Sequence, residues 1–156
     1  MSKLNSTKTS LKKLVKKCMN STFYCTLATH EKGNPWVAPV AFAYDNNFNI
    51  YFVSSQSSRH MKDISRNNKV AVAIYTTVQK VTSPKIGVQL EGKVRQVKGL
   101  EILKAYKVYF GRLVAWEGAT VAYFRSRGAE WKFYKVNTSK LFYFNQKFGD
   151  ERQAVK

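Results

Sequence analysis

The chain has 156 residues, of which 44% are hydrophobic and 23% are charged. This length and composition suit a single folded domain over 1–156 and exclude extended disorder. Lys and Arg outnumber Asp and Glu by 27 to 9, and the net charge of +18 predicts an anionic partner: nucleic acid, an anionic membrane surface or a phosphorylated small molecule. No apolar run approaches the roughly 20 residues of a membrane-spanning helix, and no signal-peptide core follows the basic N-terminus, so we expect a cytoplasmic protein without a membrane span.

The N-terminal segment predicts a short amphipathic helix. Residues 1–8 are polar and are expected to form a flexible tail. From Thr9 onward, apolar residues recur at helical spacing, with lysines on the other face. We expect this helix to pack on the domain, although a basic amphipathic helix can also lie on a membrane surface.

The period then changes to two and predicts three consecutive strands at 22–29, 35–44 and 48–54. Gly33 marks the first turn and an Asp-Asn pair marks the second. Such short connections indicate an antiparallel meander. Pro39 has no N–H group to donate, which places it at a strand edge or a bulge.

The rest of the chain continues in short elements. A bulge or barrel bend is expected at Gly92, and residues 114–124 are ambiguous but partly helical. Because strands follow one another instead of alternating with long helices, we predict a mainly β fold, an antiparallel barrel with short helices. The remaining predicted elements are helices at 57–66 and 99–111 and strands at 69–78, 86–97, 130–137 and 140–146.

Signals for catalysis or metal binding are sparse. His30 has only Glu31 beside it and His60 has no adjacent acidic residue, and no nucleophile elbow or phosphate loop is present. Cys18 and Cys25 predict two buried reduced thiols, not a disulfide framework. We predict no metal site, because nine acidic residues supply few ligands.

The stretch FVSSQSSRHMKD, which begins at Phe52, is the exception. It sets four serines, Arg59 and His60 where a strand gives way to a helix. Free N–H groups and the helix dipole favour an anion at such a position, and a guanidinium adds a charge-assisted donor. An ordinary serine cap needs one serine, so a cluster of four keeps phosphate binding open beside the capping role.

The segments LATHEKGNPWVAPVAFAYDNNFNIYFVSSQSSRHMKDISRNNKVAVAI and VQLEGKVRQV, in this order, resemble the pyridoxamine 5'-phosphate oxidase-like family of FMN-binding split barrels. The resemblance covers residues 9–97, and the C-terminal part is similar to a small subgroup of that family. It implies an antiparallel split β-barrel, a homodimer and FMN at the dimer interface. The cofactor-binding residues that it implies are Pro39, Val40, Ala41, Val53, Ser54, Ser58, Arg59, His60 and Lys62.

Within that set, the resemblance assigns the phosphate to Ser58 and Arg59, with Ser54 at the strand end. The isoalloxazine would lie along the strand around Val40. His60 stands where the family usually has lysine, and neutral histidine is a weaker phosphate partner at pH 7. Lys62 is the nearest cation that could compensate.

The oxidase's substrate-specific Arg and His have no clear counterpart here. Arg125, Arg127 and Trp131 are the nearest candidates, and we expect them to be surface charges and a core aromatic. We therefore do not predict vitamin B6 oxidation itself.

The resulting hypothesis is an FMN-binding protein and flavin-dependent oxidoreductase acting on a small-molecule redox substrate. Haem or a deazaflavin could replace FMN in a barrel of this kind. The alternative is a cationic nucleic-acid-binding barrel without redox activity, and a third interpretation is a membrane-peripheral domain that uses the basic N-terminal helix.

Overall fold

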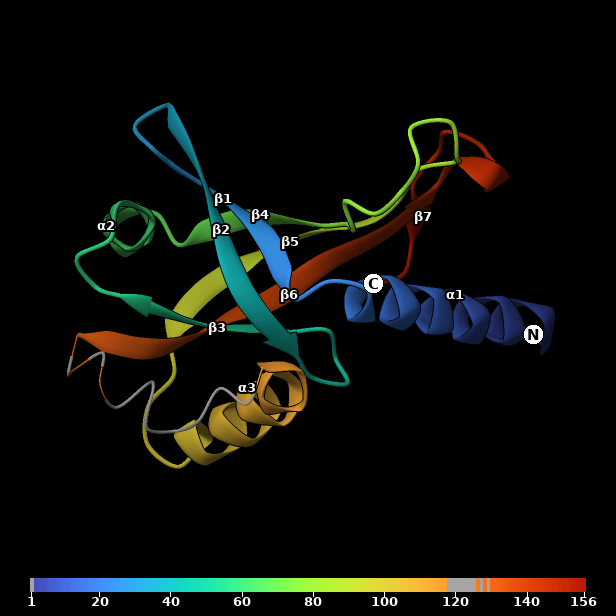
Figure 1. Cartoon of the computed structure of the whole chain (residues 1–156). Coiled ribbons are helices and arrows are strands. Elements are labelled where there is room, and N and C mark those ends of the chain that lie inside the picture. Colours follow the sequence, from blue (N-terminus) through green and yellow to red (C-terminus); the bar gives the residue numbers. More distant parts are fainter. Residues whose placement is uncertain (1, 118–125, 127, 129) are drawn as a thin grey trace.

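The computed structural model describes residues 2–117, 126, 128 and 130–156, and within these residues an antiparallel barrel forms the body of the molecule (Figure 1). Six strands follow one another in the order β3-β2-β1-β4-β5-β6, and pairing of β3 with β6 closes the ring. The mainly β, split-barrel fold predicted from the sequence is confirmed. The elements are α1 (Ser2–Asn20), β1 (Tyr24–Glu31), β2 (Asn34–Tyr44), β3 (Ile50–Ser55), α2 (Arg59–Arg66), β4 (Lys69–Ile74), β5 (Ile86–Gln96), α3 (Glu101–Glu117), β6 (Trp131–Asn145), η1 (Gln146–Phe148) and β7 (Gln153–Ala154).

The predicted meander of β1, β2 and β3 is present. Lys32 and Gly33 form the two-residue turn between β1 and β2, and both have positive φ, as a tight hairpin turn requires. Alternate residues of β2 and β3 point into the barrel, where Phe42 and Phe52 are fully buried. The period of two in β1 and β2 therefore reflects one face in the core and one face outward. In β3 the outer face is also buried, because α3 covers Tyr51.

The split of the barrel lies between β2 and β3. Residues 34–41 of β2 pair along their whole length with β1, but pairing of β2 with β3 covers only 42–44. Among the residues that the structure describes, the edge of β2 that faces β3 therefore has no strand partner before Phe42. Pro39 lies on this stretch, in agreement with its predicted place at a strand edge.

The prediction of two separate C-terminal strands, at 130–137 and 140–146, is wrong, because the single strand β6 runs unbroken through both ranges. Ser139 is an extra residue in β6, between Lys140, which pairs with Glu91, and Thr138, which pairs with Gly92. The predicted irregularity at Gly92 is therefore a bulge in the partner strand opposite it. A Cβ at Gly92 would lie only 2.5 Å from the backbone oxygen of Asn137, so the close approach of the two strands requires glycine.

Other boundaries differ from the prediction as well. The helix α1 begins at Ser2, so it includes residues 2–8, which we expected to be a loose tail. The strand β4 ends at Ile74, where its ladder with β5 ends at Val88, and residues 75–78 belong to a loop. The helix α3 extends to Glu117, and the rest of the ambiguous segment, 118–124, lies outside the described residues.

The helices cover different parts of the barrel (Figure 1). Val15 and Met19 of α1 are fully buried against one end, while Met61 and Ile64 of α2 pack into the core from the other end. The helix α3 packs outside β2 and β3, where Tyr109 contacts the sheet. Of the helices that the structure describes, none is long and apolar enough to cross a membrane.

Candidate anion and cofactor site

The four serines between β3 and α2 divide into two pairs with different surroundings. Ser55 and Ser57 build the turn itself: their hydroxyl oxygens are 2.7 Å apart, and the Ser57 N–H donates to Ser55 Oγ. Ser55 Oγ also donates to Glu130 at 3.3 Å, which ties the turn to the start of β6. These two side chains therefore have a structural role.

Ser54 and Ser58 instead gather around His60. The Nε2 atom of His60 lies 2.8 Å from Ser54 Oγ and 3.3 Å from Ser58 Oγ. Ser58 occupies the N-cap position of α2, but its hydroxyl donates backward to the Ser55 carbonyl at 2.8 Å, and no hydrogen bond from it to an N–H group of α2 is found in this part of the chain. The start of α2 therefore keeps unsatisfied donors beside two hydroxyls and an imidazole, a donor set suited to an anion.

Burial lowers the pKa of His60 below its ordinary value, and the nearby carboxylate of Asp63 opposes this only in part. The neutral imidazole is therefore the dominant form of the free protein at neutral pH. Asp63 is itself buried and accepts a hydrogen bond from Thr29 Oγ1 at 3.1 Å. This contact anchors α2 to β1.

Arg59 points away from this trio. Its guanidinium carbon lies 4.0 Å from the ring centroid of Trp36, which is a cation–π contact near the start of β2. Both side chains are exposed, so the guanidinium can move by rotamer changes alone. The structure thus brings Ser54, Ser58 and His60 together and holds Arg59 beside them on Trp36.

The strand residues of the predicted set lie at the split. Val40 points into the core, and Pro39 points outward into a groove of about 410 Å³ shared with Phe23 and Tyr75. The side chains of Ala41 and Val53 pack under α3. A planar ligand could therefore reach the free backbone edge of β2, but not the side chains of Ala41 and Val53.

Lys62 does not lie on the same side of α2 as Arg59. It lines a separate groove of about 300 Å³ with Gln56, Tyr134 and Arg95, toward β5 and β6. Trp131 begins β6 opposite Ser55 and is partly buried. Arg125 and Arg127 lie outside the described residues.

A wider groove of about 960 Å³ crosses the outer face of β1, β4 and β5. Small side chains form its floor, and Val37 stands at its border with a mostly exposed side chain. Two phenylalanines of β6 and the segment 150–152 close the other side. The size of this groove suits an organic ligand or a protruding part of another subunit.

Comparison with known families adds to this geometry. The family model described as pyridoxamine 5'-phosphate oxidase matches residues 11–140. The chain belongs to the pyridoxamine 5'-phosphate oxidase family. A search of curated proteins finds no match to this chain.

Solved structures with the same fold have different names. A haem-binding protein from Mycobacterium smegmatis is 15% identical, with a TM-score of 0.74, and the match covers 92% of this chain and 57% of that one. The General Stress Protein 26 from Bacillus anthracis is 19% identical, with a TM-score of 0.64 and coverage of 92% and 98%. A FAD-binding protein from Mesorhizobium loti is 17% identical, with a TM-score of 0.60 and coverage of 81% and 88%. At these identities the likeness shows only that the folds are shared. This chain spans little more than half of the length of the haem-binding protein.

Two contacts of this family member could not be found by sequence reasoning. Trp36 lies 23 residues before Arg59, and Thr29 lies 34 residues before Asp63. Both pairs meet only because β1 and β2 run beside α2 in the folded barrel. The one available signal was Trp36 itself, a large aromatic residue next to a proline at a turn.

Proposed function

We propose that this chain binds FMN as a homodimer and acts as a flavin-dependent oxidoreductase on a small organic substrate. The main support is the position of the unpaired β2 edge at the split, next to the Ser54–Ser58–His60 cluster and Arg59. An edge of free backbone groups suits the polar rim of an isoalloxazine, and the cluster suits a phosphate. Bound flavin would supply the electron-transfer chemistry.

In this proposal each protein group has a defined task. The Ser58 hydroxyl turns from the Ser55 carbonyl to the phosphate, which the first N–H groups of α2 also hold. Arg59 leaves Trp36 to form a charge-assisted fork, and His60 donates from Nε2. Ser54 fixes the orientation of the imidazole. Lys62 contributes only long-range attraction, because it lines another groove.

The homodimer is supported by the outer face of the barrel. Tyr24, Val37 and Tyr75 are more than half exposed, and they border the grooves of about 410 and 960 Å³. A second copy would cover these apolar side chains, which monomeric proteins seldom leave open in one area. Cys18 and Cys25 are free buried thiols, as suits the reducing cytoplasm that we propose as the location.

A flavin titration tests the proposal. FMN should bind with quenching of its fluorescence and co-elute with a dimer, while riboflavin, which lacks the phosphate, should bind more weakly. The Arg59→Ala variant should lose about 1.5–3 kcal/mol of FMN affinity, the range of a charge-assisted hydrogen bond. Arg66→Ala is the matched control, because Arg66 lies on the same helix but pairs with Glu31 at 2.8 Å.

Equal FMN affinity in the wild type and in Arg59→Ala would show that the phosphate is held elsewhere. A Soret band after addition of haemin, without flavin binding, would favour haem. A protein that ignores both cofactors and binds oligonucleotides with a steep salt dependence would favour the nucleic-acid alternative. Phe42, Tyr51 and Phe52 argue against that alternative, since they are buried and cannot stack on bases.

A further inference from the structure

The loop between β4 and β5, residues 75–85, presents aliphatic side chains to solvent from a well-bonded backbone. Val78 and Val81 are 87% and 91% exposed. Lys85 Nζ donates to the carbonyl oxygens of Lys80, Val81 and Ser83, so the loop folds around its own lysine. The backbone is thus satisfied internally while the valines contact nothing that would shield them from water.

The 3-10 helix η1 extends this exposed apolar area. The N–H of Lys85 donates to Gln146 Oε1 at 2.8 Å, and the N–H of Gln146 donates to the Lys85 carbonyl at 3.0 Å. These two bonds hold η1 against the loop. Phe148, at the end of η1, is 60% exposed and adds an aromatic ring to the same end of the barrel.

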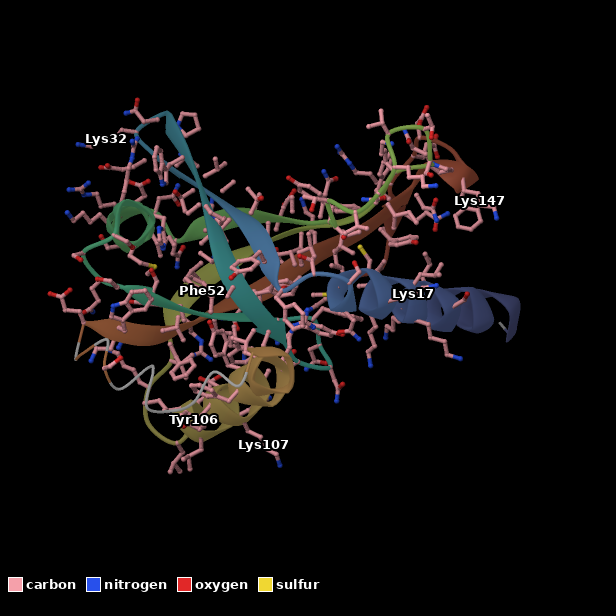
Figure 2. The ribbon with its side chains drawn as sticks, in the orientation of Figure 1. Lys17, Lys32, Phe52, Tyr106, Lys107 and Lys147 are labelled. Atoms are coloured by element: carbon pink, nitrogen blue, oxygen red, sulfur yellow. The ribbon has the colours of Figure 1, made fainter. Side chains whose placement is uncertain are left out.

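The helix α1 adds a dense positive charge at this end. Cys18 Sγ donates to the Ile74 carbonyl, so the C-terminal half of α1 lies where β4 gives way to the loop. Exposed lysines cover the outer face of α1, opposite the buried Val15, at Lys12, Lys13, Lys16 and Lys17. Figure 2 shows Lys17 and Lys147 on the same side of the barrel, with Lys32 on the opposite side.

The net charge of these segments can be counted from the sequence. Residues 2–20, 75–85 and 146–156 contain eleven Lys and Arg and two Asp and Glu, a net charge of +9. Half of the total of +18 is therefore carried by one end of the barrel. At the opposite end, α2 pairs Arg66 with Glu31 and contains the buried carboxylate of Asp63, beside the cations Arg59 and Lys62.

We propose that this cationic end, formed by α1, the 75–85 loop and η1, binds the surface of an anionic lipid bilayer. Exposed valines and a phenylalanine can enter the interface between headgroups and acyl chains, while the lysines contact anionic headgroups. Nucleic acid would use the lysines but would gain nothing from two exposed valines. The site for the flavin phosphate lies at the other end and stays open. Tyr75 and Val78 also line the groove of about 410 Å³ that borders the proposed dimer face, so the inference requires a dimer that leaves Val78 and Val81 exposed.

Vesicle co-sedimentation of the purified 156-residue chain tests this. The wild type should bind vesicles of phosphatidylcholine with about 30% phosphatidylserine and should not bind pure phosphatidylcholine vesicles. Lys16→Gln and Lys17→Gln should each weaken binding on the order of fivefold. Lys32→Gln and Lys93→Gln, which lie elsewhere on the surface, should leave binding unchanged.

The double variant Val78→Ser/Val81→Ser should weaken vesicle binding about tenfold, since two buried side chains are replaced by polar ones. Leu100→Ser/Leu103→Ser is its matched control, because these leucines are 87% and 70% exposed near α3. In Val81→Trp, the tryptophan emission should shift to the blue with anionic vesicles and be quenched by brominated acyl chains. Because the chain already has three tryptophans, the wild type supplies the baseline spectrum, and the additional shift at saturating lipid reports insertion.

Three results would overturn the inference. The first is equal loss of binding in the valine and leucine pairs, and the second is an unchanged Val81→Trp spectrum with anionic vesicles. The third is dissociation of a dimer by Val78→Ser/Val81→Ser without any vesicle binding of the wild type, which would assign the patch to a second copy. Binding of oligonucleotides in place of vesicles, lost on removal of the lysines alone, would assign it to nucleic acid.

Discussion

Replacement of His60 by lysine should tighten FMN binding at and above neutral pH and remove most of its pH dependence. In the free protein, burial lowers the pKa of His60, so the imidazole is mainly uncharged at neutral pH. A phosphate beside Nε2 would stabilise the imidazolium and raise the His60 pKa in the complex. Binding then takes up a proton, and FMN affinity falls as the pH rises through the pKa of the complex.

The groups around His60 set the size of this effect. Ser54 and Ser58 contact Nε2 directly, and Asp63 is the nearby carboxylate that also favours the charged ring. Arg59 and Lys62 flank it on the same helix and oppose a further positive charge. A charge-assisted hydrogen bond contributes about 1.5–3 kcal/mol, and because His60 is only half-buried we expect the lower end, about a tenfold change in affinity.

Fluorescence titration with FMN from about pH 6 to 9 measures this profile. His60→Gln supplies the baseline, because the phosphate itself titrates near pH 6. The wild type should lose about tenfold more affinity than His60→Gln as the pH rises, whereas His60→Lys should follow the baseline at a higher affinity, because lysine stays charged over this range. Parallel profiles for the wild type and His60→Gln would refute the placement of the phosphate at Nε2.

Three further predictions concern stability, measured by thermal and urea unfolding. Gly92→Ala should cost about 1–3 kcal/mol, because its Cβ would collide with the backbone oxygen of Asn137 at 2.5 Å. Arg112→Leu should cost about 2 kcal/mol, because Arg112 Nη2 donates to two carbonyl groups at the C-terminal end of α1. Thr29→Val should cost about 1–3 kcal/mol, because it leaves the buried carboxylate of Asp63 without its hydroxyl donor.

Matched substitutions separate these causes from general damage. Gly111→Ala should not destabilise, since nothing lies within 4 Å of its Cβ position and alanine favours a helix. Thr29→Ser keeps the hydroxyl and should retain most of the stability. Arg112→Lys keeps the charge but loses the fork, so a loss equal to that of Arg112→Leu would assign the effect to geometry and not to charge.

The sequence predicts those parts of the barrel in which the local pattern of apolar and polar residues matches their burial in the folded structure. The strands β1 and β2 alternate because one face is buried, and Gly33 marks a turn that needs positive φ. The polar residues 138–139 separate the two strands predicted at 130–137 and 140–146. In the structure Thr138 instead donates to the Phe48 carbonyl, a partner 90 residues away in the sequence, and β6 continues.

The end of β4 shows the same limit. Tyr75 and Val78 continue a strand-like pattern, but the strand ends at Ile74 where its ladder with β5 ends, at Val88. A strand extends only as far as a neighbouring strand pairs with it, and the length of that pairing cannot be determined from a single sequence. The family resemblance brought Ser58 and Arg59 into one site, but only the fold places Trp36 under the guanidinium.

Salt dependence should distinguish the two ends of the molecule. Charges farther apart than about 8 Å are largely screened at physiological ionic strength, so the lysines of α1 contribute little to a phosphate at α2, across the barrel. FMN affinity should therefore fall only shallowly with salt, since few cations lie near the phosphate. Vesicle binding should fall steeply, because the cationic end carries a net charge of +9. If both affinities fell with the same steep slope in the wild type and in Lys16→Gln/Lys17→Gln, the division of charge between two binding surfaces would be wrong, and a single anionic ligand would have to contact both ends.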